Sequence, residues 1–172
     1  AIIYEGHVRD FTSLYSADTR THGKFESLME TGTTCNLKST GMDYIKELGI
    51  THIQLLPVAD FATVDEFYPM YHYNWGYDPL QYGVPEGSFS SNPNDPYARV
   101  IEFRKLVNAF HANGIMVIMD VVFNHMYDIK ASMMENCCPY YFFRYDENKE
   151  LSNGSFCGND FDSTMYLARN HI

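Results

Sequence analysis

The apolar run Ile115–Val122 (IMVIMDVV) constrains the fold of this chain more than any other feature. An almost continuous apolar segment of this length is typical of a strand in a parallel sheet that is covered on both faces. Gly114 stands directly before the run, where it is expected to end a preceding helix. A helix that leads into a buried strand predicts an α/β protein.

Further strand and helix patterns alternate along the chain. Strands are expected at Ile2–Val8 and Thr51–Val58, and helices at Gly41–Leu48, from Asp95 to Gly114 and from Ser163 onward. In the middle helix Asp95 is the expected N-cap and Pro96 the first helical residue. The apolar stripe of this helix is expected at Val100, Phe103, Val107 and Phe110.

Long segments without a periodic pattern, Ala59–Asp95 and Asn124–Asp160, follow the second and third strands. Loops after the strands carry the active sites of (β/α)₈ barrels, which take about 250 residues when complete. The sequence therefore predicts a partial (β/α)₈ TIM barrel that consists of the first three βα units. We expect residues 1–172 to be the truncated N-terminal portion of such a barrel, because the last helical pattern reaches the C-terminus without a stop signal.

Composition and charge exclude several classes of protein. The net charge of −10, without a Lys/Arg cluster, argues against a nucleic-acid partner. No apolar run approaches the roughly 18 residues of a membrane span, and no targeting signal is visible at the start of the chain. The four cysteines lack zinc-ligand spacing, which favours reduced thiols and slightly favours the cytoplasm over secretion. No metal site and no cofactor are expected.

Polar residues stand at the end of the third predicted strand. Asp120 interrupts the apolar run, where a charged group is costly unless it is paired or exposed at the strand end. Asn124 and His125 follow at the junction with the loop. Either Asp120 satisfies local backbone amides, or the three side chains converge at the mouth of a barrel; the grouping favours a site.

The segment Tyr71–Pro79 (YHYNWGYDP) concentrates aromatic rings beside hydrogen-bonding groups. Rings can cover the apolar face of a sugar while carboxylates, amides or imidazoles bind its hydroxyls. An aromatic loop packed against its own protein core would have the same composition, so the residue types alone leave both interpretations open. We find no pair of carboxylates with the context expected for glycoside hydrolysis.

Two motifs at these residues resemble glycoside hydrolase family 13, the α-amylase family, and within it the type I pullulanases. DVVFNH (Asp120–His125) resembles the first motif shared by the family, and YNWGYDP (Tyr73–Pro79) is similar to the pullulanase signature. The supporting stretches are YEGHVRDF, LGITHIQLLPV and LSNGSFCGND, so the likeness covers essentially the whole chain. Departures are Gly6, in place of an apolar strand residue, and Phe123, in place of a frequent Tyr.

The resemblance implies roles for five residues. Tyr77 would stack on the glucose ring in the subsite before the scissile bond, and His125 would hydrogen-bond that glucose. Asp78 would lie near the substrate, Asp120 would hold the architecture around the site, and Asn124 would orient the loop. The Asn position helps to bind calcium in some relatives, but no further ligands are identifiable here, so no metal site is expected.

The resemblance also implies a function for the parent protein: debranching of pullulan-like α-glucans by retaining hydrolysis of α-1,6 links. The family's nucleophile and acid/base lie in motifs beyond residue 172, so no catalytic residue is assigned and the isolated chain is expected to be inactive. An isoamylase-like or branching enzyme is an alternative, as is a non-catalytic glucan-binding fragment. An open three-strand sheet also predicts poor solubility.

Overall fold

The computed structural model describes residues 1–172, which form two compact units. The first unit contains Ala1–Val58, Val64–Trp75 and Pro85–Asp120. The second unit contains Ala59–Thr63, Gly76–Val84 and Val121–Ile172. Each unit is described separately below.

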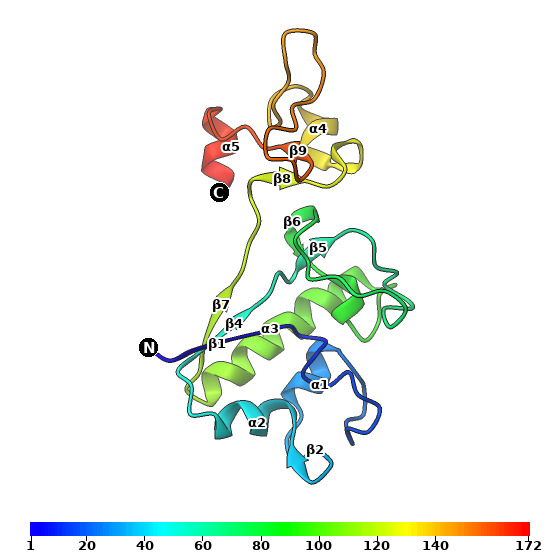
Figure 1. Ribbon diagram of the computed structural model, residues 1–172, viewed down its shortest axis with the longest axis vertical. Coiled ribbons are helices and arrows are strands. Elements are labelled where there is room, and N and C mark those ends of the chain that lie inside the picture. Colours follow the sequence, from blue (N-terminus) through cyan, green and yellow to red (C-terminus); the bar gives the residue numbers. More distant parts are fainter. The chain divides into compact units, whose positions relative to one another are not determined.

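The first unit is built on a parallel sheet of three strands in the order β1-β4-β7 (Figure 1). The strands are β1 (Ile3–Gly6), β4 (His52–Leu55) and β7 (Met116–Met119). Ile3 pairs with His52, and His52 pairs with Met116. All three strands expected from the sequence are present, and their parallel order confirms an α/β fold with part of a (β/α)₈ barrel.

Helices cover one side of this sheet (Figure 1). They are α1 (Phe25–Met29), α2 (Gly41–Glu47) and α3 (Pro96–Ala112), with the 3₁₀ helix η1 (Gly87–Phe89) before α3. A small hairpin of β2 (Thr34–Cys35) and β3 (Lys38–Ser39) precedes α2. The sequence before Gly41 is polar and rich in turn-forming residues and shows no helical or strand period, so it does not predict α1 or the hairpin. The core of the unit is fully buried and includes Phe25, Leu28, Ile45, Ile53, Leu55, Leu106 and Phe110.

Helix α3 begins as the sequence predicts, but its buried stripe differs from the predicted one near the start of the helix. The Asp95 carboxylate accepts a hydrogen bond from the Tyr97 backbone N–H at 2.9 Å, and Gly114 has a φ of +73° beyond the helix end. The predicted stripe is wrong at Val100, which is 40% exposed, whereas Glu102, Leu106 and Phe110 are buried. Glu102 tolerates burial because its carboxylate accepts hydrogen bonds from the backbone and the hydroxyl of Ser91.

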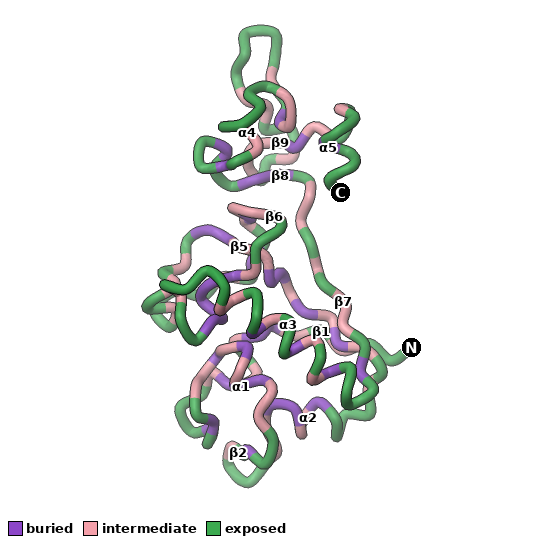
Figure 2. Tube along the Cα trace, turned by 180° about the vertical axis from the view of Figure 1, so that it is seen from behind, coloured by how far each residue is buried: buried purple, intermediate pink, exposed green.

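Strand β7 is shorter than the apolar run that predicts it. It ends at Met119, so Asp120 follows the strand rather than interrupting it. The Asp120 backbone N–H still donates to the Leu55 carbonyl oxygen at 3.0 Å. Cover on both faces was also expected, but Ile3 and Met116, which both pair with His52, are each 54% exposed. Figure 2 shows the start of the chain, which leads into β1, coloured as exposed. Within these residues the sheet is covered by helices on one side only.

The second unit has short elements where the sequence shows long loops. Two small sheets are formed by β5 (Ala59–Phe61) with β6 (Pro79–Pro85), and by β8 (His125–Met126) with β9 (Asn159–Asp160). The helices are η2 (Ile129–Ala131), α4 (Met133–Cys137) and α5 (Tyr166–His171), the last at the expected place. The hydrophobic core consists of Met126, Ile129, Phe143, Phe161 and Ala168, with Tyr82 packed against it.

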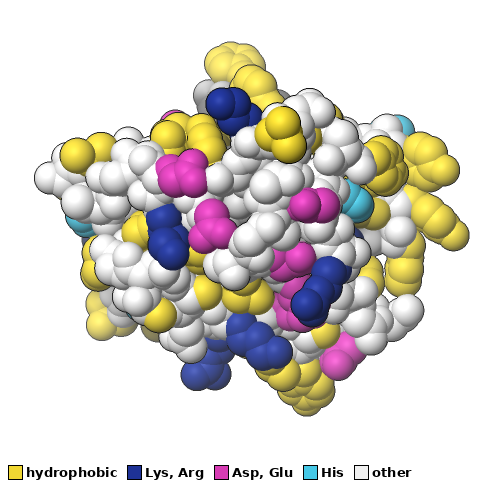
Figure 3. All heavy atoms as spheres, turned by 90° about the horizontal axis from the view of Figure 1, so that it is seen from below, with side chains coloured by type: hydrophobic (Ala, Val, Ile, Leu, Met, Phe, Trp, Pro, Cys, Tyr) yellow, Lys and Arg dark blue, Asp and Glu magenta, His cyan; other side chains and the backbone are white.

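The surface carries charges of both signs. Figure 3 shows basic and acidic side chains interspersed with hydrophobic ones over the face that it draws, rather than a patch of one sign. None of the helices is both long enough and apolar enough to cross a lipid bilayer. The four cysteines are free thiols, and three of them are exposed.

Candidate functional site

A cavity of about 650 Å³ in the second unit brings together four of the five predicted site residues. They are Tyr77, Asp78, Asn124 and His125. The rest of the lining comes from Val121, Val122, Phe123, Tyr127 and Cys157. We call this cavity the His125 pocket. It combines an aromatic surface with a few polar groups, as small-molecule sites commonly do.

His125 occupies the most constrained position in this pocket. It lies on β8, pairs with Asp160 of β9, and is only 4% exposed. Its carbonyl oxygen accepts a hydrogen bond of 2.6 Å from the Tyr82 hydroxyl, and its ring Nδ1 lies 3.1 Å from Asn124 Oδ1. In the tautomer that carries its proton on Nδ1, the ring donates to this amide oxygen. The backbone and the ring of His125 are therefore both held in place.

The charge state of His125 follows from its surroundings. Burial lowers the pKa of the imidazole below its ordinary value, because desolvation disfavours the cation. The carboxylates of Asp78 and Asp160 and a hydrogen bond to the Tyr77 backbone act in the opposite direction without overcoming burial. At neutral pH the ring is uncharged, which suits hydrogen bonding to neutral hydroxyl groups.

Tyr77 and Asp78 reach the pocket from the turn that precedes β6. Gly76 has a φ of +91°, a backbone conformation that strongly favours glycine. Asp78 is tied to the neighbouring chain, because its carbonyl accepts from the Ala62 N–H at 3.0 Å and its carboxylate accepts from the Thr63 hydroxyl at 3.3 Å. Tyr77 is 39% exposed, so part of its ring surface is open to a ligand.

The aromatic segment Tyr71–Pro79 is divided between the two units. Up to Trp75 it belongs to the first unit, where the Tyr73 hydroxyl donates to the Asp10 carboxylate at 2.6 Å. The Arg9 guanidinium lies 5.2 Å from the Tyr73 ring centroid. Burial and the hydrogen bond to Asp10 raise the pKa of Tyr73 to about 12. Tyr73 is half exposed, but its hydroxyl is engaged by Asp10 within the first unit. Only the second half of the segment lines the His125 pocket.

Asp120 belongs to the first unit and follows β7 directly. Its predicted role as an architectural residue of the site stays a prediction.

Sequence reasoning did not single out Tyr127 or Cys157 as pocket residues. Tyr127 stands two residues after His125 and directly after β8, and side chains two residues apart in extended chain point to the same side. This spacing could have drawn attention to it. Cys157 comes from a loop without periodicity, and no sequence pattern places it near His125.

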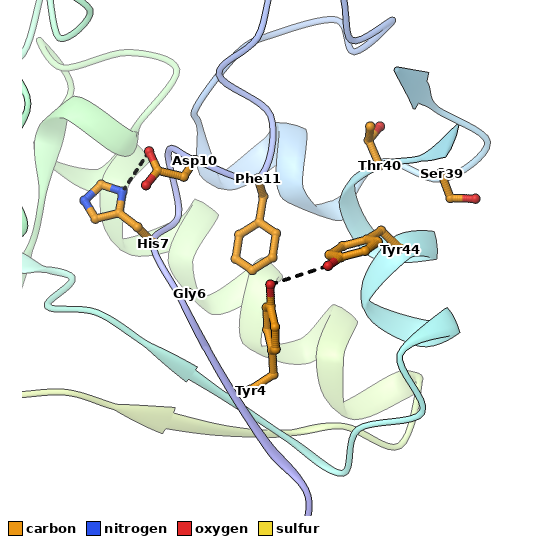
Figure 4. A pocket seen from close by; sticks show the side chains of 8 residues that line it. All are labelled: Tyr4, Gly6, His7, Asp10, Phe11, Ser39, Thr40 and Tyr44. Carbon is orange, nitrogen blue, oxygen red and sulfur yellow. Dashed lines mark hydrogen bonds and ion pairs between the residues drawn. The ribbon is translucent and has the colours of Figure 1, made fainter. Parts of the chain in front are cut away.

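A second cavity of about 420 Å³ lies in the first unit between β1, the following loop and α2. The rings of Tyr4, Phe11 and Tyr44 face one another there (Figure 4). The polar groups are engaged within the protein, since the hydroxyls of Tyr4 and Tyr44 lie 3.4 Å apart and Asp10 accepts from Tyr73. None of the five predicted site residues lines this cavity.

The chain belongs to the α-amylase family: the family described as alpha amylase, catalytic domain, matches residues 34–150. Among its relatives, the pullulanase of Bacillus subtilis (strain 168) is 49% identical over all of this chain and 24% of its own length. A maize chloroplastic isoamylase, SU1, is 30% identical over 99% of this chain and 21% of its own length.

The crystal structure of a pullulanase from Anoxybacillus sp. LM18-11 complexed with maltotetraose matches with a TM-score of 0.91 at 48% identity. That match covers 99% of this chain and 25% of the crystal structure's chain. This chain spans about a quarter of the length of these two pullulanases.

Proposed function

We propose that the protein containing this chain is a debranching glycosidase that hydrolyses α-1,6-glucosidic links in pullulan-like α-glucans with retention of configuration. Residues 1–172 form the N-terminal portion of its catalytic barrel and supply a binding wall for the glucan. The nucleophile and the acid/base come from outside these residues. The similarity to pullulanases over the whole chain supports this proposal.

The observation that carries the proposal is the combination of groups in the His125 pocket. A partly exposed Tyr77 ring lies beside the Asp78 carboxylate and an uncharged, buried His125. A sugar ring presents an apolar face for stacking and hydroxyl groups for hydrogen bonds, and this pocket has partners for both. In the proposed site Tyr77 stacks on glucose, while His125 and Asp78 bind hydroxyls. Asn124 holds the imidazole through Nδ1, and Asp120 supports the surrounding backbone.

Product analysis with the full-length protein tests the activity. Incubation with pullulan is expected to release maltotriose, because pullulan consists of maltotriose units joined by α-1,6 links. Amylose, which contains only α-1,4 links, is the matched control and is expected to stay intact. Release of short oligosaccharides from amylose, or no maltotriose from pullulan, would overturn the proposal.

An isoamylase-like activity is the second candidate, supported by the 30% identity to the maize isoamylase. The same experiment separates the two when glycogen is added as a third substrate, since an isoamylase-like enzyme is expected to debranch glycogen in preference to pullulan. The third candidate, a glucan-binding protein without hydrolytic activity, predicts binding of maltooligosaccharides and no product from any of the three substrates.

A further inference from the structure

One wall of the His125 pocket comes from the loop of residues 152–158, which we call the 152–158 loop. It precedes β9 and contributes Cys157 to the pocket lining. The loop has no helix or strand of its own, so most of its backbone groups must find partners elsewhere. The side chain that supplies several of these partners is Asp160.

The Asp160 carboxylate is 7% exposed and lies against the inner side of the loop. One oxygen accepts hydrogen bonds from the Ser152 hydroxyl at 2.8 Å and the Gly154 N–H at 2.6 Å. The other oxygen accepts from the Ser155 N–H at 3.0 Å. Burial by itself raises the pKa of Asp160, but the hydrogen bonds from Ser155, Ser152 and Gly154 outweigh it and lower the pKa to about 2. The carboxylate is therefore ionised under ordinary conditions.

The same loop presses against the imidazole of His125. Gly158 has a φ of +149°, and a Cβ added there would lie 3.1 Å from His125 Cδ2 and 3.1 Å from the Met126 carbonyl oxygen. The adjacent Asn159 side-chain amide donates to that carbonyl at 3.2 Å, and Asp160 pairs with His125 across the β8-β9 ladder. The loop thus limits the space into which the His125 ring can turn.

We propose that Asp160 is a positioning residue for the His125 pocket. Its ionised carboxylate folds the 152–158 loop into the shape that confines His125 and places Cys157 in the pocket wall. An Asn at this position could not accept the same set of hydrogen bonds. Its NH₂ group is a donor and would face an N–H or hydroxyl that needs an acceptor. The consequence for glucan binding rests on the proposed function, whereas the consequence for the loop does not.

The alternative is that Asp160 stabilises the fold and has no influence on the pocket. Asp146 provides a matched comparison, because its carboxylate accepts hydrogen bonds of 2.8 Å from the N–H groups of Asn148 and Glu150 in a neighbouring turn. The turn at Asp146 contributes no residue to the lining of the His125 pocket. Asp160→Asn and Asp146→Asn remove the same charge from the same unit, and only Asp160→Asn is expected to change the pocket.

The experiment measures two properties of the full-length protein and of both variants. The first is the rate at which a small thiol reagent labels Cys157, followed by mass spectrometry of the peptide that contains it, with and without maltotriose. The second is the Michaelis constant and kcat on pullulan. Asp160→Asn is expected to change the labelling rate and to raise KM, each by about tenfold, with a smaller change in kcat. Asp146→Asn is expected to leave both within about twofold of the wild type.

Gly158→Ala is the second variant, in case Asp160→Asn fails to fold. It keeps the carboxylate and its hydrogen bonds but forces the loop away from His125, so it is expected to raise KM and to shift the imidazole NMR titration of His125. Unchanged Cys157 labelling and unchanged KM in folded Asp160→Asn would overturn the inference. If the protein releases no maltotriose from pullulan, the proposed function fails, but Cys157 labelling still decides whether Asp160 shapes the loop.

Discussion

The two units of this chain are stabilised in different ways. In the first unit, parallel strands pack against helices, and the interior is filled by aliphatic and aromatic side chains such as Leu55, Leu106 and Phe110. The second unit has only two-stranded sheets and short helices, and the Asp160 side chain holds part of its backbone in the loop before β9. The first unit depends mainly on hydrophobic packing, whereas the second depends more on individual hydrogen bonds. The candidate pocket lies in the second.

Removal of a large core side chain from the first unit is expected to have the largest effect. Phe110→Ala leaves a cavity between α3 and the sheet and is expected to lower the free energy of unfolding by about 3–5 kcal/mol. Val100→Ala on the same helix is the control, with an expected change of about 0.5 kcal/mol or less because this side chain is exposed. Urea denaturation followed by circular dichroism measures both, and similar losses in the two variants would contradict the described packing of α3.

The stability of the second unit is expected to depend on pH through the ionisation of the Asp160 carboxylate. The pKa of Asp160 falls from 3.8 to about 2 on folding. Its stabilising contribution is therefore complete above about pH 4 and is lost as the pH falls toward 2, with a size of about 2 kcal/mol. The difference in unfolding free energy between wild type and Asp160→Asn should shrink over this range. A difference that stays constant from pH 6 to pH 2 would show that the carboxylate is not stabilised by folding.

Substitutions in the two halves of the aromatic segment are expected to affect different properties: glucan binding in the second half and stability in the first. Tyr77→Ala removes the ring proposed to stack on glucose and is expected to weaken maltotriose binding about tenfold, while Tyr77→Phe keeps it within about twofold. Tyr73→Phe removes the hydroxyl bonded to Asp10 and is expected to cost about 1 kcal/mol of stability without affecting binding. Isothermal titration calorimetry on the full-length protein is the measurement. Equal losses of affinity in Tyr77→Ala and Tyr73→Phe would remove the distinction between the halves.

The smallest effect is expected at the start of α3, where a single hydrogen bond is lost from a unit that depends on packing. Asp95→Ala removes the acceptor for the Tyr97 N–H and is expected to destabilise the protein by about 1 kcal/mol. Asp95→Ser retains an N-cap acceptor and should recover most of this loss. A loss much above 2 kcal/mol in thermal denaturation would mean that hydrogen bonds matter as much in the first unit as in the second.

The sequence predicts the first unit well because its elements follow simple periodic patterns. The three strands and α3, with its Asp95 cap, lie close to their expected places. The stripe of α3 was wrong at Val100, because hydrophobicity alone does not predict burial of Glu102, whose carboxylate accepts hydrogen bonds from Ser91. The helix α1 was missed because five residues are too few to show a period.

The pocket was predictable only in part. Tyr77, Asp78, Asn124 and His125 stand in two compact motifs, and they do line one cavity. The contribution of Asp160 could not be predicted, because it depends on loop hydrogen bonds and on pairing with a strand 35 residues earlier. The division of the aromatic segment between the two units could not be predicted from the sequence either. Tyr73 and Tyr77 are the same residue type, and only their contacts in the structure distinguish them.

The register of β1, β4 and β7 has a consequence for the kinetics of folding. Each strand pairs with a partner that lies tens of residues away along the chain, whereas the hydrogen bonds of α3 are local. Closing such long loops before any strand contact forms makes parallel pairing slow compared with helix formation. In that interval the apolar strands remain available to other molecules. We therefore expect refolding yield to depend on protein concentration and temperature more than on equilibrium stability.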